Sequence, residues 1–178
     1  MDTIAPALAL APPAHADLDA LLAFELANRA FFEATINARP PGYYSREGVA
    51  GAIAAAIEDA ALDRGYQFLV KSAAGELIGR VNLSGIKRAH YHSGVLGYRI
   101  GQSFGGRGIA SAAVRQVLAI AFGRLGLKRI EADASVDNAG SIRVLERNGF
   151  VQYGRSRRSF ELQGRWYDRL HFERHADA

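Results

Sequence analysis

The glycine cluster at residues 104–110 is the part of this chain best suited to bind a diphosphate. It lies between a segment typical of a β-strand and a segment with helical spacing. Such a turn presents several unpaired backbone N–H groups and the positive end of a helix dipole to one place. Glycine lets phosphate oxygens approach those amides closely, and Arg107 adds a cation. The pattern predicts a diphosphate-binding loop; the alternative is a turn that only connects strand to helix.

Two widespread phosphate-binding motifs fit this loop poorly. In a dinucleotide fingerprint that begins with Gly106 and Gly108, the third glycine falls on Ser111. Gly101 and Gly106 have the spacing of a P-loop, but Arg107 and Gly108 stand where Lys and Ser or Thr are required. The sequence therefore argues against a Rossmann dinucleotide site and against P-loop kinase chemistry.

Length and composition favour a single domain over residues 1–178. The 178 residues are 49% hydrophobic, which is enough for one buried core. The chain has no cysteine, which excludes disulfides, thiolate zinc sites and a cysteine nucleophile. His90 and His92 have no carboxylate at a metal-binding spacing. We therefore expect no metal site.

The sequence carries no sign of a membrane or secretory segment. No apolar run approaches the roughly twenty residues of a membrane helix. Asp2 stands where a signal peptide carries Lys or Arg, and Pro6, Pro12 and Pro13 interrupt the first segment, so we interpret it as mature sequence. A reducing cytoplasm fits the lack of cysteine. The expected protein is cytoplasmic and has no membrane partner.

Basic residues are concentrated in the last third of the chain. The net charge is +4, and residues 143–174 hold eight arginines against four acidic residues, which accounts for the whole excess. A solvated basic face explains this arrangement without any ligand. The functional alternative is attraction for an anionic ligand or for a partner bound to RNA.

Hydrophobic periodicity predicts the order β-α-α-β-β-β-α-β-α-β-β, which makes a mixed sheet with helices on both faces. Ser45 is expected to cap the second helix, because its hydroxyl can accept a hydrogen bond from a free amide in the first turn. The strands are expected at residues 7–11, 66–71, 77–83, 94–101, 128–136, 150–156 and 166–172. The helices are expected to begin near residues 17, 45, 109 and 138.

Eight short motifs, spread over nearly the whole chain, resemble those of one enzyme family in their order and spacing. They lie at residues 8–12, 28–29, 78–83, 96–100, 106–109, 129–132, 138–150 and 164–168. Together they resemble the GNAT superfamily of N-acetyltransferases, and in particular its RimJ/RimL-like ribosomal-protein enzymes. The resemblance implies an α/β (mixed α+β) GNAT fold with a mostly antiparallel mixed sheet, helices on both faces and a splayed central pair of strands.

The resemblance also implies a binding site for acetyl-CoA between the splayed strands. Backbone groups of the first strand would pair with the pantetheine, the glycine loop would hold the pyrophosphate, and the next helix would begin with an Asn that bonds the pantetheine arm. Asn138 can equally be an ordinary helix cap. The residues expected to bind the cofactor are Ile100, Gln102, Gly105, Gly106, Arg107, Gly108, Ile109, Ala110, Asn138 and Ser141.

The resemblance leaves the catalytic groups incomplete. Many GNAT enzymes place a Tyr, four residues after the position of Ser141, as the acid for the leaving thiolate, and this chain has Leu145 there. Ser141 resembles a serine proposed for that role in RimL-type enzymes. The RimL-type Glu falls on Phe160 in an ungapped count, one residue from Glu161. Glu131 and Asp133 are the candidates for relaying a proton through water, and a structural salt bridge is the alternative role for each.

The acceptor amine is not encoded in any motif, because folds and CoA sites do not choose substrates. The resemblance implies the α-amine of a protein N-terminus, such as that of a ribosomal protein, together with ribosome association and a homodimer. The alternatives are acetylation of a small-molecule amine or antibiotic, and a non-catalytic acyl-CoA-binding module. The basic excess counts against a polyamine, because like charges repel.

Overall fold

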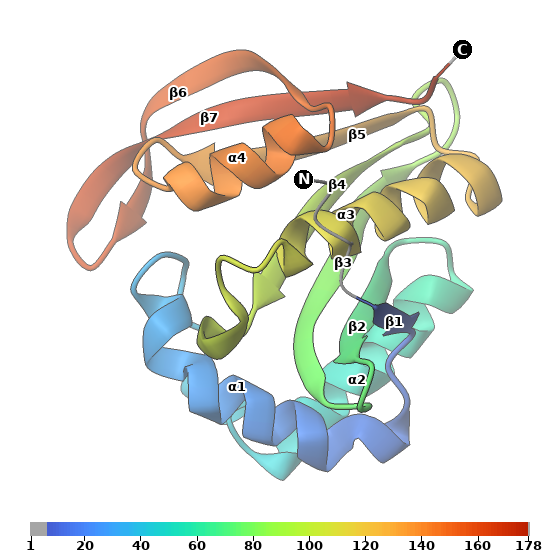
Figure 1. Ribbon diagram of the computed structural model, residues 1–178, viewed down its shortest axis with the longest axis vertical. Coiled ribbons are helices and arrows are strands. Elements are labelled where there is room, and N and C mark those ends of the chain that lie inside the picture. The colour runs from blue at the N-terminus through green and yellow to red at the C-terminus, as the bar shows by residue number, and fades with distance from the viewer. Residues whose placement is uncertain (1–6, 178) are drawn as a thin grey trace.

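The segments of alternating hydrophobicity form one seven-stranded sheet in this computed structural model, which describes residues 7–177. The strand order is β1-β2-β3-β4-β5-β7-β6, and every neighbouring pair is antiparallel except the parallel pair β4 and β5 (Figure 1). The strands are β1 Leu8–Ala11, β2 Tyr66–Ser72, β3 Leu77–Lys87, β4 Ser93–Ile100, β5 Arg129–Ser135, β6 Val151–Leu162 and β7 Arg165–His175. The interpretation of Asp2 and Pro6 as mature sequence lies outside the described residues.

The structure describes four α-helices, of which the second and the fourth begin with a side-chain cap. In the described chain they are α1 Leu18–Glu33, α2 Arg46–Ala61, α3 Ile109–Ala119 and α4 Ala139–Arg147. Ser45 Oγ accepts a hydrogen bond from the Gly48 amide at 3.0 Å and caps α2, as predicted. The helix that starts with α3 continues into one wider turn, Ile120–Arg124, before Gly126 at φ +63° ends it.

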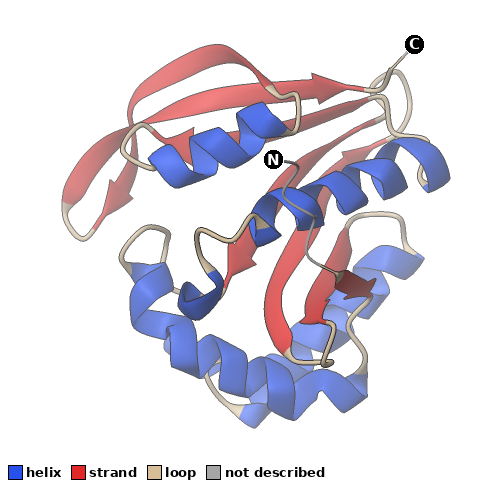
Figure 2. Ribbon diagram, in the orientation of Figure 1, coloured by secondary structure: helices blue, strands red, loops and turns tan. Residues whose placement is uncertain are grey.

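Helices cover both faces of the sheet (Figure 2). Successive residues of β2 point to opposite faces, so Phe68 and Val70 join one core while Leu69 joins the other. The first core packs α3 and α4 against the sheet and includes the fully buried Leu145. The second packs α1 and α2 around Ile53. Burial of these two apolar layers fixes the sheet between the helix pairs.

Strands β4 and β5 are paired only where they begin. The register joins residues 93–95 to residues 129–131, and no later residue of β4 pairs with β5. Both strands continue, to Ile100 and to Ser135, and they diverge as they do so (Figure 1). The splayed central pair is therefore observed. Backbone groups on the facing edges of the diverging segments have no strand partner, which leaves them available to a ligand.

The predicted order of elements and the mixed α/β class are confirmed, and the last two strands are longer than predicted. We expected strands at residues 150–156 and 166–172, whereas β6 extends to Leu162 and β7 spans Arg165–His175. The register shifts between Ser156 and Phe160, where Arg158 has φ +46°. Such an irregularity breaks the alternation in the sequence while pairing resumes beyond it. Within residues 7–177, no helix has the length and apolar character needed to span a bilayer.

Candidate active site

The glycine loop between β4 and α3 has the free amides that a diphosphate requires. Gly106 and Gly108 have φ angles of +74° and +75°, and a Cβ built on either would meet no heavy atom within 4 Å. Among the described residues, the amides of residues 106–111 donate to no turn, loop or cap acceptor. The Ala112 amide is the first to do so, at 3.0 Å from the Gly108 carbonyl. The loop is thus an open cradle at the positive end of α3.

A cavity of about 350 Å³ lies beside this loop. The loop and α3 contribute Gly106 and Ala110 to its lining, and α4 contributes Arg143 and Arg147. Both arginines are exposed, so their guanidinium groups can move toward a phosphate group bound there. The predicted phosphate-binding segment, residues 105–110, therefore has suitable geometry, and cations from a second helix support it.

A cleft of about 400 Å³ opens between the splayed strands. On one wall lie Leu96, Tyr98 and Ile100 from β4, and on the other Ala132 and Ala134 from β5. Residues 105–106 and 110 of the glycine loop and α3 also line this cleft, so it reaches the phosphate cradle. A slot with apolar walls and unpaired strand edges fits an extended chain that carries amide groups, such as pantetheine.

Tyr98 and Ser141 meet inside the cleft. The Tyr98 hydroxyl lies 2.8 Å from Ser141 Oγ and donates to the Ser141 carbonyl oxygen at 3.2 Å. Burial raises the pKa of Tyr98, and the hydrogen bond to Ser141 acts in the opposite direction. A phenol that stays protonated and contacts a serine hydroxyl can pass a proton along the pair. The sequence singled out Ser141 but not Tyr98.

The Asn138 side chain can make two contacts at once, because its amide group has an oxygen that accepts and a nitrogen that donates hydrogen bonds. Its Oδ1 accepts a hydrogen bond from the Ser141 amide at 3.0 Å and caps α4. Among the described residues no acceptor bonds its Nδ2, and the side chain lines the cleft. The cap and the predicted contact with pantetheine are therefore compatible. Because the cap also holds the first turn of α4, Asn138 orients Ser141.

The two predicted backbone contacts at the end of β4 differ in availability. Ile100 lines both the cleft and the cavity beside the glycine loop. The Gln102 amide already donates to Asn28 Oδ1 at 2.8 Å, and the Gln102 carbonyl accepts from the Gly105 amide at 3.1 Å. Asn28 on α1 thus anchors the start of the loop. Of the two residues, Ile100 has the position that a cofactor contact requires.

Glu131 lies outside the lining of the cleft. Its carboxylate accepts a hydrogen bond from the Tyr153 hydroxyl at 2.9 Å and lies 3.0 Å from Arg129. These contacts give it the structural salt bridge that the sequence allowed as an alternative. Asp133, two residues along β5, does line the cleft and is paired with Arg169. In the described chain, Asp133 is the one carboxylate in the lining of this cleft.

The sequence departs from the family pattern at Leu145 and Phe160, and the structure shows where each side chain lies. Leu145 is completely buried in the core between α4 and the sheet, so that position cannot present a side chain to the cleft. Phe160 lines a second pocket, of about 220 Å³, and the Arg169 guanidinium lies 4.6 Å from the centre of its ring. Glu161 does not line that pocket. Asp137 does, and no ion pair or hydrogen bond engages its side chain among the described residues.

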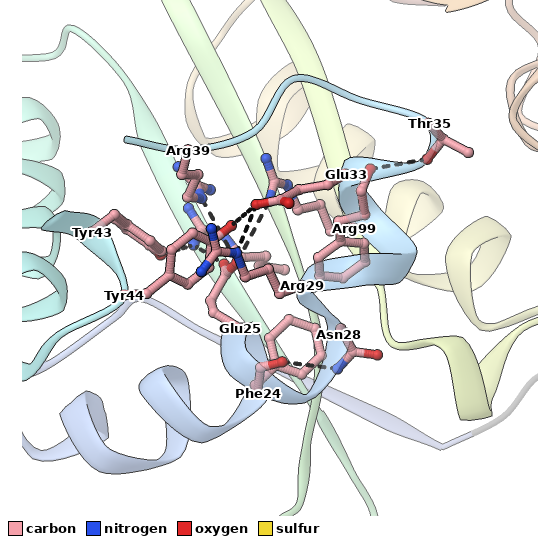
Figure 3. Close-up of polar contacts among 12 residues, drawn as sticks. Phe24, Glu25, Asn28, Arg29, Glu33, Thr35, Arg39, Tyr43, Tyr44 and Arg99 are labelled. Carbon is pink, nitrogen blue, oxygen red and sulfur yellow. Dashed lines mark hydrogen bonds and ion pairs between the residues drawn. The ribbon is translucent and has the colours of Figure 1, made fainter. Parts of the chain in front are cut away.

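Behind the α1 side of the cleft, three arginines surround one buried glutamate. Figure 3 labels Glu25, Arg39 and Arg99 of this cluster. Glu25 is 0% exposed and lies 2.7 Å from Arg80, 3.5 Å from Arg99 and 3.7 Å from Arg39. Arg99 also lines the cleft. Sequence reasoning missed this cluster, since its members come from α1, the following loop, β3 and β4. The one available signal was Arg80 within an otherwise apolar run of β3.

The chain is similar to known acetyltransferases in sequence and in structure. Residues 7–151 match the family described as acetyltransferase (GNAT) domain. The probable N-acetyltransferase YjcK of Bacillus subtilis (strain 168) is 37% identical over 153 residues, covering 85% of this chain and 84% of that protein.

Two solved structures share the fold over almost the full chain. The ribosomal-protein-S5-alanine acetyltransferase from Vibrio fischeri has a TM-score of 0.91 at 24% identity, covering 96% of this chain and 93% of that one. Mycobacterium smegmatis RimJ in complex with CoA-disulfide has a TM-score of 0.87 at 26% identity, covering 95% and 82%.

Proposed function

The chain belongs to the GNAT acetyltransferase family and is an acetyl-CoA-dependent N-acetyltransferase, and from this premise we propose that its acceptor is the α-amine of a protein N-terminus. The observation that carries the proposal is the charge of the two adjoining cavities. In the described chain their lining holds Asp133, already paired with Arg169, one unpaired carboxylate at Asp137, and the cation Arg99. One unpaired carboxylate suits one amine, whereas a polyamine would bring several positive charges toward two arginines.

The lack of a strong base in the cleft also favours an α-amine. An α-amine has an ordinary pKa of about 8, against about 10.4 for a lysine side chain. A substantial part of an α-amine is therefore already neutral and nucleophilic near pH 8. Asp137 accepts the remaining proton through water in this proposal, since it lines the pocket and its carboxylate is unpaired among the described residues.

The second pocket has room for the residues that follow an acceptor amine. It lies between the end of α1, with Ala34 and Thr35, and the β6–β7 hairpin, with Phe160 and Tyr167. The Gln163 side chain at the hairpin tip donates to the Glu33 carbonyl at 3.3 Å and holds these two parts together. An extended N-terminal segment enters between them in this proposal. The resemblance of the fold to a ribosomal-protein-S5-alanine acetyltransferase supports a peptide acceptor.

In this proposal, some residues bind acetyl-CoA and others transfer protons. Acetyl-CoA supplies an activated acyl group as a thioester. The glycine loop, Ile100 and Asn138 hold the acetyl-CoA in the cleft. Holding both reactants in one cleft removes much of the barrier by positioning alone. The new bond joins the amine nitrogen to the acyl carbon, and the nitrogen gives up a proton through water to Asp137. The carbon–sulfur bond breaks, and the thiolate takes a proton. Ser141, with Tyr98 behind it, donates that proton.

The proposal is tested by following free thiol while the protein turns over different acceptors with acetyl-CoA. Peptides that begin with Ala or Ser should release thiol, and spermine and aminoglycosides should not. Release with spermine or an aminoglycoside alone would replace the proposal with a small-molecule acetyltransferase. CoA binding without release from any acceptor would identify a non-catalytic module. Matched Ser141→Ala and Asn138→Ala variants should differ, the first lowering kcat and the second raising the KM for acetyl-CoA.

We also propose that the protein forms a homodimer and associates with ribosomes, as the RimJ/RimL resemblance implies. The excess of basic residues at positions 143–174 favours attraction to RNA-bound partners. Light scattering on purified protein tests the dimer. Co-sedimentation with ribosomes at low and moderate salt tests the association, which should weaken as salt rises.

A further inference from the structure

The arginine cluster behind the cleft begins with two like charges on neighbouring strands. The register of β3 and β4 places Arg80 directly opposite Arg99 on the sheet face that α1 and α2 cover. Like charges opposite each other destabilise a sheet unless a counter-ion lies between them. Glu25 on α1 supplies that counter-ion, and its Oε1 accepts a 2.7 Å hydrogen bond from Arg80. Arg39, from the loop after α1, adds a third cation (Figure 3).

The cluster has more positive charge than it can neutralise. Three arginines face one glutamate, so its formal charge is 3 − 1 = +2. The nearby Arg29 and Glu33 pair with each other at 2.9 Å and leave this surplus unchanged. Burying a cation without a partner raises the free energy of the folded protein. The cluster therefore favours binding of an anion.

The three arginines of the cluster differ in how many hydrogen bonds they donate. Arg80 is well satisfied, since it also donates to Tyr43 at 3.0 Å and to Gln67 at 3.2 Å. In the described chain Arg99 makes one long hydrogen bond, at 3.5 Å to Glu25, and its guanidinium lies 5.2 Å from the centre of the Phe32 ring. The buried Arg39 Nε has no hydrogen-bond partner among residues 7–177. The unused donors therefore belong to Arg99 and Arg39, and not to Arg80.

Of these two arginines, Arg99 lies at the cleft. Arg99 lines it, and its side chain is 17% exposed. The opposite wall is already neutral, because Asp133 and Arg169 form a pair there. Burial and the charge of Arg39 both lower the pKa of Arg99, which agrees with a local shortage of negative charge. The remaining carboxylate, Asp137, is in the adjoining pocket.

We propose that the acceptor carries a carboxylate close to its amine, and that Arg99, backed by Arg39, binds this carboxylate. The inference rests on the proposed amine acceptor and adds an acidic group to it. A guanidinium binds a carboxylate through two parallel N–H donors, and Arg99 has donors to spare. The carboxylate comes either from an acidic side chain next to the N-terminus of a peptide or from a free amino acid.

The experiment compares acceptors that differ only in this charge. Peptides that begin Ser-Asp and Ser-Asn are nearly identical in shape, and serine is paired with serinamide as the small-molecule equivalent. We expect kcat/KM to be about tenfold to a hundredfold higher for the acidic member of the preferred pair, the effect of one charge-assisted hydrogen bond. The peptide pair identifies a protein acceptor, and the serine pair an amino-acid acceptor.

Variants of the cluster test whether the preference for an acidic acceptor depends on Arg99. In Arg99→Gln the ratio of acidic to amide acceptor should fall to near one, and Arg99→Lys should restore part of it. Arg64→Gln, which removes an exposed arginine paired with Asp59 on α2, should keep the full ratio. Thermal unfolding of each variant separates loss of recognition from loss of fold. Arg39→Gln gives a second test that leaves Arg99 in place.

The outcomes separate this inference from the proposed function. Equal rates with acidic and amide acceptors would refute the carboxylate site while leaving the acetyltransferase proposal intact. No thiol release with any acceptor would refute the peptide proposal. In that case calorimetry with N-acetyl-Ser-Asp and N-acetyl-Ser-Asn on the CoA-loaded protein still decides the matter. Tighter binding of the acidic product, lost in Arg99→Gln, supports the site; equal binding overturns it.

Discussion

Gly106→Ala should weaken CoA binding far more than it weakens the fold. Gly106 has φ +74°, and an added methyl group would project into open space where no protein atom lies within 4 Å. The left-handed backbone costs a non-glycine residue about 1–2 kcal/mol. For a chain of this size that free energy lowers the melting temperature by about 2–8 °C. The fold therefore survives, and the methyl group stands where the phosphate must approach the amides.

The size of the binding effect follows from the amides that the methyl group shields. A hydrogen bond to a charged group contributes about 1.5–3 kcal/mol, so loss of one raises the Kd for CoA about tenfold to a hundredfold. Calorimetric titration of CoA into the variant measures this directly.

The chain offers a matched control in Gly75→Ala. Gly75 has φ +83° in the turn between β2 and β3, and an added Cβ there also meets nothing within 4 Å. The two variants should lose similar stability, because the backbone cost is the same. Only Gly106→Ala should lose affinity. If both variants bind CoA as tightly as the wild type, or if Gly75→Ala weakens binding equally, the loop is not the diphosphate cradle.

Three further variants test the proposed proton donor, the buried arginine cluster and an ion pair away from the site. Tyr98→Phe should lower kcat with little change in the KM for acetyl-CoA, and should add nothing to Ser141→Ala if the two hydroxyls act as one proton donor, as steady-state kinetics of the double variant will reveal. Glu25→Gln leaves buried arginines without their anion and should cost about 3–5 kcal/mol, measured by urea unfolding. The guanidinium of Arg88 lowers the pKa of Asp63 to about 2. The ionised Asp63 carboxylate therefore stabilises the folded protein above about pH 4, and this contribution is lost as pH falls toward 2. Asp63→Asn should unfold with less acid sensitivity in that window, and an unchanged acid-unfolding profile would contradict this.

Local patterns of the sequence were enough to predict the order of elements and a glycine loop between β4 and α3. The hydrophobic period of each segment depends only on neighbouring residues, and so do the cap at Ser45 and the glycines at 106 and 108. The GNAT family, its RimJ/RimL-like character and the use of acetyl-CoA followed from a resemblance that rests on these same local motifs. All three are confirmed.

Only the tertiary structure decided which polar groups act together. Tyr98 and Ser141 are 43 residues apart, and Glu25 meets Arg80 and Arg99 across 55 and 74 residues. The register shifts between Ser156 and Phe160, and Phe160 lines the second pocket, while the short pairing of β4 with β5 opens the cleft. Such distances are set by strand register and helix packing. A linear pattern does not contain them, because register depends on which surfaces are buried together.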